Sequence, residues 1–155
     1  AIVFNHGVHC NNASCMVDWI RDVFTPFYVK EYLGAPNSTH ERYFPMWREH
    51  EPQHFDTDGG IHKEGTTKRI CKANIAFDNY RNEIAEQYFK EHESLLGEMY
   101  IVRLFEQLKP MNMLHYDKRG DCTHYCYSPW RFDVSWHGIA RGFEILWKKR
   151  HARRN

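Results

Sequence analysis

The chain has 155 residues, a length typical of one domain with a core of its own. Its 21 lysines and arginines are balanced by 20 acidic residues, so a formal charge of +1 gives no reason to expect nucleic acid as a partner. Aromatic residues make up 15% of the chain, which argues against disorder. No apolar run approaches the roughly 18 residues that would span a membrane, so we expect no transmembrane segment in this chain.

The first third of the chain predicts a strand, a helix and a second strand. Residues 2–5 form a short apolar strand. The apolar residues that follow at helical spacing are Val17, Ile20 and Phe24. We expect this helix to stop or restart at Thr25-Pro26. Residues 42–49 resemble another strand, in which Pro45 favours an edge position or a bulge.

The rest of the chain continues the alternation of helices and strands. Residues 73–94 have a helical stripe of Phe77, Tyr80, Ile84 and Tyr88. Gly97 is placed to end that helix. Residues 99–105 show almost no alternation, which is typical of a strand buried on both faces of a parallel sheet. A last helix is expected at 134–150, so the order of elements predicts an α/β fold.

The segment with the most chemistry is "DCTHYC", residues 121–126, between the last apolar strand and the last helix. On a turn or a first helical turn, Asp121 and His124 would share one face. The carboxylate could then hold one imidazole nitrogen and leave the other free to accept a proton from a hydroxyl nucleophile. Sites of α/β proteins gather at the carboxyl ends of strands, which gives this location its weight.

A metal site is the main alternative for the same segment. In an extended chain, Cys122, His124 and Cys126 would place three zinc-type ligands on one face. The single-residue spacers differ from the usual zinc pattern, and no matching second knuckle follows. A zinc-binding module is therefore the second hypothesis, and Cys122 and Cys126 look more like disulfide halves. Our first hypothesis includes neither a metal nor another cofactor.

Three motifs resemble those of a known family. "DCTHYCYSPWRFDVSW" resembles the D-C-[ST]-H-W-C-L-P-G element of the plant trichome-birefringence-like polysaccharide O-acetyltransferases, within the GDSL/SGNH-like acyl-esterase (PC-esterase) family. "IVFNHGVHC" is similar to that family's V-F-N-T-G-H-W-W strand and turn, and "MWREHEPQHF" to its F-R-T-x-S-P-x-H-F segment. The motifs occur in the family order between residues 2 and 136. Tyr125 and Tyr127 replace the usual tryptophan and leucine.

The resemblance implies an SGNH-hydrolase-like, flavodoxin-like fold of three layers around a parallel sheet. This chain would supply its C-terminal portion, with about three strands and flanking helices. The implied activity is O-acyl transfer to, or acyl-ester hydrolysis on, a polysaccharide or other glycan, with a glycan acceptor and an acyl donor as partners. A serine in a G-D-S turn would attack the ester, His124 would be its general base, and Asp121 would orient that histidine.

The resemblance also implies substrate-facing residues outside the Asp–His pair. Turn groups near Gly7 and His9 fall where SGNH enzymes keep oxyanion-hole donors. Arg48 and His54 match the family's middle motif, and either a contact to the acyl group or glycan or a buried ion pair would explain them.

The nucleophile of the implied triad has no match in this chain. The five serines, none in a G-D-S or G-x-S-x-G context, are Ser14, Ser38, Ser94, Ser128 and Ser135. Gly120-Asp121-Cys122 imitates G-D-S with a thiol, but family order places that block before the strand at Ile2. We therefore expect residues 1–155 to be the C-terminal part of one domain whose nucleophile-bearing part lies upstream. A third hypothesis is a non-catalytic carbohydrate-binding relative.

Cysteines and sequons bear on the compartment. The five cysteines, all disulfide candidates, are Cys10, Cys15, Cys71, Cys122 and Cys126. We expect Cys122 and Cys126 to join different disulfides, with Cys71 as the partner of one of them. Asn12 and Asn37 begin N-x-S/T sequons and are candidate glycosylation sites. Together these features favour an oxidising compartment, either the Golgi lumen or the outside of the cell.

Overall fold

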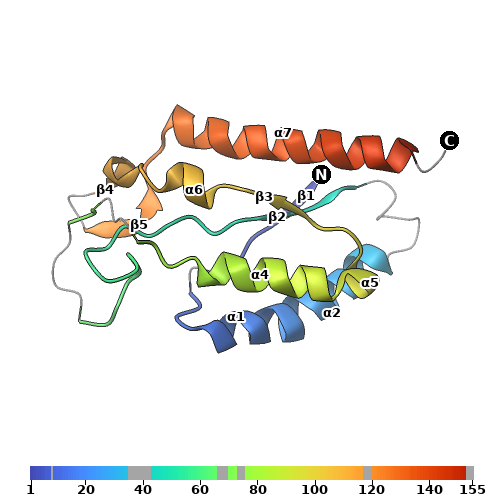
Figure 1. The fold of residues 1–155 in the computed structure, drawn as a ribbon, viewed down its shortest axis with the longest axis horizontal. Helices are drawn as coiled ribbons and strands as arrows, with labels where there is room; N and C mark the ends of the chain where they lie inside the picture. Colours follow the sequence, from blue (N-terminus) through green and yellow to red (C-terminus); the bar gives the residue numbers. More distant parts are fainter. Residues whose placement is uncertain (8, 35–42, 66–69, 73–75, 117–119, 153–155) are drawn as a thin grey trace.

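The computed structural model describes residues 1–7, 9–34, 43–65, 70–72, 76–116 and 120–152. Its centre is a three-stranded parallel sheet of β1 (Ile2–Phe4), β2 (Pro45–Arg48) and β3 (Tyr100–Val102), in that order. Helices cover both faces of the sheet (Figure 1). The α/β class predicted from the sequence, with a parallel sheet flanked by helices, is confirmed.

Pro45 lies in the middle strand, neither at an edge nor at a bulge as the sequence suggested. It is the first residue of β2 and is paired in register with Ile2 of β1. The hydrogen bond at this point runs from Ile2 N to Phe44 O, at 2.9 Å, so the missing N–H of the proline is not needed there. A strand's first residue is a position that tolerates proline even in the interior of a sheet.

One face of the sheet is covered by a continuous helical run of α1 (Ala13–Trp19), η1 (Ile20–Phe24), α2 (Thr25–Phe27) and η2 (Tyr28–Leu33). Its buried residues are Met16, Ile20, Phe24, Tyr28 and Tyr32. A strict four-residue repeat is longer than the 3.6-residue α-helical turn, and the wider π turns of η1 and η2 help to keep this stripe facing the sheet. The sequence predicted that the helix stops or restarts at Thr25-Pro26, and the structure shows the restart: η1 ends at Phe24, α2 begins at Thr25, and Pro26 lies in the first turn of α2.

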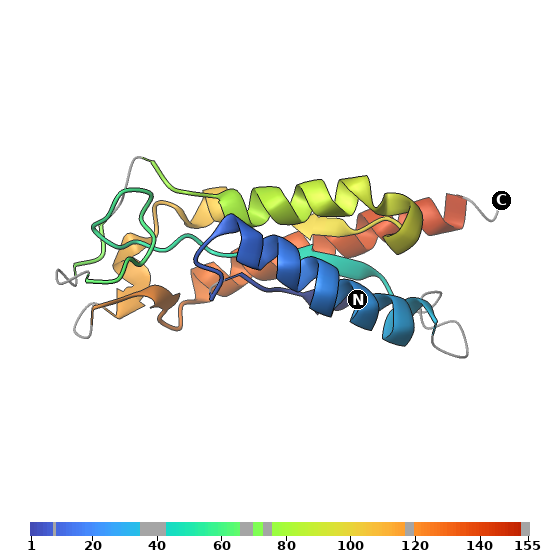
Figure 2. The ribbon, with the colours of Figure 1, turned by 90° about the horizontal axis from the view of Figure 1, so that it is seen from below.

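The same face carries α4 (Tyr80–Glu91) and α5 (Glu93–Leu96), with α1 beside α4 (Figure 2). The helix expected from residue 73 starts later among the described residues, since Phe77 instead forms a β-bridge with Gly59. Residues 73–75 lie outside the described part. As predicted, the helical region ends at Gly97, whose φ of 72° suits a residue without a side chain.

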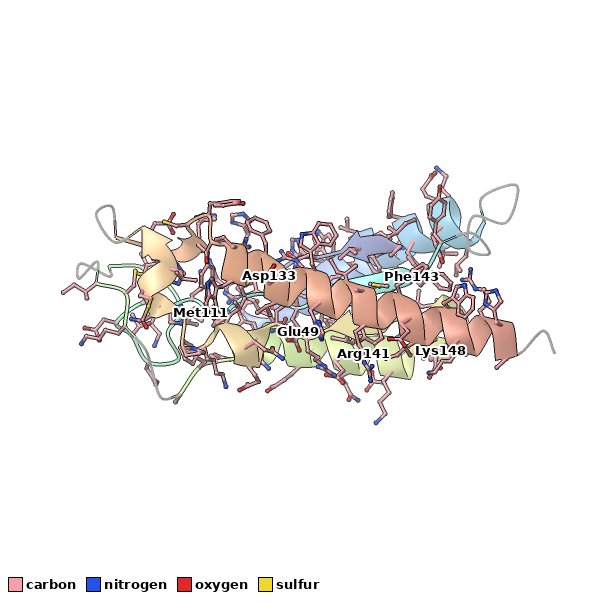
Figure 3. The ribbon with its side chains drawn as sticks, turned by 90° about the horizontal axis from the view of Figure 1, so that it is seen from above. Glu49, Met111, Asp133, Arg141, Phe143 and Lys148 are labelled. Atoms are coloured by element: carbon pink, nitrogen blue, oxygen red, sulfur yellow. A yellow bond between two sulfur atoms is a disulfide. The ribbon has the colours of Figure 1, made fainter. Side chains whose placement is uncertain are left out.

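The other face is covered by α7 (Pro129–Ala152), with α6 (Phe105–Leu108) at its edge. Phe143 and Arg141 project from opposite sides of α7 (Figure 3). The helix begins five residues before the expected 134, because Pro129 is well suited to a first helical position. No helix in the described residues is both long enough and apolar enough to cross a membrane.

The segment with the Asp–His pair lies in a strand and not in a helical turn. It is β5 (Asp121–Tyr125), paired antiparallel with β4 (His115–Tyr116), which follows η3 (Asn112–Leu114). His54 N donates to Cys122 O at 2.9 Å, which joins this hairpin to the segment after β2. The hairpin therefore lies at the end of the molecule to which the parallel strands lead (Figure 1).

Candidate active site

Asp121 and His124 are in direct contact. His124 Nδ1 lies 2.8 Å from Asp121 Oδ2, and because an ionised carboxylate only accepts, Nδ1 carries the hydrogen. Asp121 Oδ1 also accepts the backbone N–H groups of Thr123 and His124, both at 3.0 Å. This local turn explains how residues three apart in a strand can meet. The His124 side chain is 77% exposed, so its second nitrogen is open to a substrate or nucleophile.

The environment of Asp121 keeps it ionised. Partial burial raises the pKa of its carboxyl group. The hydrogen bonds from the backbone and ring of His124 and from the Thr123 amide outweigh that effect, so the pKa is lowered below its usual value. A carboxylate that stays charged can stabilise an imidazolium when His124 takes up a proton.

A pocket of about 220 Å³ lies against the pair. The residues that line it come from four separate parts of the chain: Asn5, Arg48, His50, Glu51, Thr123, His124, Tyr125 and Arg131. Asn5 follows β1. Arg48 is the last residue of β2, residues 49–51 follow it, and Arg131 lies near the start of α7. The site is thus assembled at the carboxyl ends of neighbouring parallel strands, where open α/β sheets place their ligand sites.

Glu51 holds the two arginines of the pocket. Its Oε1 accepts from Arg48 Nη1 and from Arg131 Nη2, each at 2.6 Å. Asn5 Nδ2 donates to Arg48 O at 2.7 Å, and Arg48 Nη2 donates to Asn5 Oδ1 at 3.3 Å. Two guanidinium groups share one carboxylate, so the pocket keeps an excess of hydrogen-bond donors for an electron-rich group.

His50 supplies a neutral ring at the back of the pocket. Burial lowers its pKa to about 3, and the nearby cations Arg81 and Arg48 act in the same direction. The backbone at His50 is fixed by Asn82, whose amide group accepts from His50 N at 2.7 Å and donates to His50 O at 3.0 Å. This ring is therefore uncharged at neutral pH.

The structure brings only some of the predicted site residues together. Arg48 and His124 line the pocket, whereas Gly7, His9 and His54 do not. Gly7 is buried behind it, since a side chain there would approach the His50 ring at 3.3 Å. His9 is exposed elsewhere, and His54 is fully buried. The oxyanion roles of Gly7 and His9 stay predictions, and His54 occupies a structural position in a buried hydrogen-bond network.

All five cysteines lie in the described residues. Cys71 is bonded to Cys122, one of the two partners predicted for it, and Cys10 is bonded to Cys15. The predicted disulfide of Cys126 is wrong: its thiol is free, because the other four cysteines pair among themselves. Cys122 is consequently not available as a zinc ligand, and no group of three or more possible metal-binding side chains occurs among the described residues. Two disulfides fit a protein of the secretory route.

The two candidate glycosylation sites are Asn12 and Asn37. Asn12 is exposed and caps α1, with Oδ1 accepting from Cys15 N at 2.8 Å. A glycan on its amide nitrogen would leave that oxygen free for capping, so glycosylation here stays a prediction. Asn37 lies outside the described residues.

The serine nucleophile that the family resemblance implies does not accompany the pair in the described part of the chain. No described serine hydroxyl bonds to His124: the hydroxyl of Ser14 donates to Asn12, and that of Ser135 to the Arg131 carbonyl. Cys122 is buried in its disulfide and cannot act as a nucleophile. Ser38 lies outside the described residues.

Six residues that line the pocket were not predicted as site residues from the sequence: Asn5, His50, Glu51, Thr123, Tyr125 and Arg131. Asn5 had a usable signal, because it directly follows an apolar strand in a region where α/β sites form. Glu51 and Arg131 are 80 residues apart, and neither has a local pattern that distinguishes it from an ordinary surface charge.

No family model, curated protein or solved structure matches this chain.

Proposed function

We propose that this chain is the acid–base part of an SGNH-type O-acyltransferase or acylesterase that acts on a polysaccharide or other glycan. The observation that carries the proposal is the 2.8 Å contact between Asp121 and an exposed His124. The donor-rich pocket beside it suits an ester carbonyl or sugar hydroxyls. Together with the three ordered motifs, this arrangement favours acyl transfer over a zinc site.

The sheet supports the same proposal. A flavodoxin-like sheet has the strand order 2-1-3-4-5. Three parallel strands in the consecutive order β1-β2-β3 fit the last three positions of that order. Within the described residues, β1 pairs with β2 alone, so its other edge is available to a strand that carries the nucleophile. We propose that an upstream segment supplies this strand and its G-D-S serine.

The proposed reaction assigns a role to each member of the pair. The serine hydroxyl attacks the acyl carbonyl while His124 Nε2 takes its proton, and Asp121 stabilises the resulting imidazolium. His124 then returns the proton to the departing alkoxide, which leaves an acyl-serine. A glycan hydroxyl or water next attacks that acyl group, with His124 again acting as base. The Golgi lumen or the cell exterior would supply the glycan and the oxidising conditions.

The test is an acyl-ester assay on the natural full-length protein. Replacing His124 by Asn should remove nearly all release of p-nitrophenol from p-nitrophenyl acetate, because His124 is the only base in contact with Asp121 among the described residues. The matched control is His137→Asn, which changes an exposed histidine of α7. Residues 1–155 alone should be inactive in the same assay. Full turnover by a folded His124→Asn protein would overturn the proposal.

A further inference from the structure

Behind the pocket, three buried or half-buried rings from three segments form a network. His54 follows β2, His115 begins β4, and Tyr125 ends β5. His54 is 0% exposed and His115 is 4% exposed. The ring of His54 approaches that of His115 with His54 Nδ1 only 2.6 Å from His115 Nε2. This network connects the loop after β2 to the hairpin that carries Asp121 and His124.

The outer nitrogens of the two rings both face backbone carbonyls. His54 Nε2 lies 2.8 Å from Lys109 O, and His115 Nδ1 lies 2.9 Å from His124 O. A carbonyl oxygen can only accept, so each of these nitrogens must carry a hydrogen. In two neutral imidazoles, the facing nitrogens His54 Nδ1 and His115 Nε2 would then both be bare.

Two bare nitrogens cannot be stable at a separation of 2.6 Å, because their lone pairs would repel. A third hydrogen between them resolves the conflict and turns the repulsion into a charge-assisted hydrogen bond. Tyr125 does not supply it: its single hydroxyl hydrogen goes to Pro52 O at 3.0 Å, and its oxygen is 3.4 Å from His54 Nδ1. The two rings together therefore need three hydrogens, one more than two neutral histidines have.

We propose that His54 and His115 act as one proton-binding unit, which shares a single proton and thereby positions the backbone of His124. Losing the proton would force one ring to give up its bond to Lys109 O or to His124 O. The unit is thus a pH-dependent clamp between the β4–β5 hairpin and the core. It concerns the conformation of β5 and stands whether or not the proposed acyl transfer is correct.

The charged and titratable groups around the unit act in both directions. Burial lowers the pKa of His54 to about 4, and the nearby His115 acts in the same direction. Burial also lowers the pKa of His115. Asp121 and Glu51 favour a charge on His115, whereas His124 disfavours it. Two further charged neighbours among the described residues are Lys109 and Arg131. Lys109 offers its carbonyl to His54 while its ammonium group pairs with Glu106, and the Arg131 guanidinium lies over the Tyr125 ring. The proposal requires the repulsion between the two bare nitrogens, 2.6 Å apart, to outweigh this burial effect and to raise the pKa of the shared proton above that of an unfolded histidine.

Long-range proton–nitrogen correlation spectra of the uniformly ¹⁵N-labelled protein test the proton directly. We expect protonated His54 Nε2 and His115 Nδ1 at neutral pH, with a nitrogen–nitrogen coupling across the bond that joins the two rings. Both rings should titrate together. Bare nitrogen at either carbonyl-facing position, or two independent titrations without coupling, would overturn the proposal.

Hydrogen exchange tests the clamp. A group whose pKa is higher in the folded than in the unfolded protein stabilises the fold at pH values below the unfolded pKa. That stabilisation is lost as the pH rises through the folded pKa. The exchange protection of the β5 amides should therefore fall at higher pH in the natural protein, after correction for intrinsic exchange. This fall should vanish in His115→Gln and persist in the control His137→Gln. An unchanged fall in His115→Gln would contradict the clamp, and the spectra of the natural protein decide the matter should that variant not fold.

Discussion

The backbone of α7 at Gly142 lies directly against the ring of Tyr100 in β3. A Cβ atom at position 142 would clash with Tyr100 Cδ1 and Cε1. Helix propensity alone would make Gly142→Ala stabilising by about 0.5–1 kcal/mol. We expect the opposite, a loss of about 1–3 kcal/mol, because the helix must move off the sheet.

Chemical denaturation of the Gly142→Ala protein measures this effect. The control is Ala140→Gly, on the exposed side of the same helix, which gives the propensity contribution without a clash. A Gly142→Ala protein as stable as the natural one would show that the tight packing of α7 on β3 is not required.

Replacement of Asp121 by Asn should impair the proposed reaction without unfolding the protein. An amide favours the wrong His124 tautomer and does not stabilise the imidazolium, so turnover in the full-length protein should fall by roughly four orders of magnitude. A loss of less than tenfold, in a protein with unchanged thermal unfolding, would argue against the triad assignment.

The same aspartate predicts a pH dependence of stability. Its pKa is lowered in the folded protein, so its contribution is present above the unfolded pKa of about 3.9 and is lost as pH falls through the folded value. Carboxyl ¹³C shifts of Asp121 should therefore titrate below the pKa of an aspartate in an unfolded chain. Titration of Asp121 above its unfolded pKa would contradict the hydrogen bonds described here.

Glu49 joins β2 to the segment after β3. Its Oε2 accepts from Leu104 N at 2.7 Å and Phe105 N at 2.9 Å, while Oε1 accepts from Arg103. Glu49→Gln should destabilise the fold by about 1–3 kcal/mol, because an uncharged amide can place only one oxygen among three donors. Denaturant unfolding measures the loss. Glu83→Gln, on α4, is the control, and an equal effect of the two changes would refute the role of Glu49.

The Cys71–Cys122 disulfide closes a long loop, with a sequence separation of 51. The chain-entropy relation predicts that Cys71→Ala with Cys122→Ala costs about 4 kcal/mol. Cys126→Ser should change stability far less, because that thiol is free. Thermal unfolding of both proteins checks this, together with non-reducing mass mapping of the natural one. Detection of Cys126 in a disulfide would restore the pairing expected from the sequence.

The sequence by itself determined the features that depend on neighbouring residues. Asp121 and His124 could be paired from their spacing, since a local turn brings residues three apart into contact, as the Asp121 side chain does by accepting the amides of Thr123 and His124. Gly97 could be placed at a helix end because a positive φ favours glycine there. The apolar strand at residues 2–5 and the alternation of strands with helices likewise gave the α/β class.

The tertiary structure alone decided where these elements lie relative to one another. Pro45 can occupy the middle strand because β1 does not require an amide hydrogen from position 45. This depends on how the strands pair, which the local sequence does not show. Glu51 and Arg131 meet across 80 residues, and His54 meets His115 across 61. Such contacts form because the helices and strands bury their apolar faces on a common sheet. This burial fixes the order of the strands, and the order of the strands determines which polar side chains share the pocket.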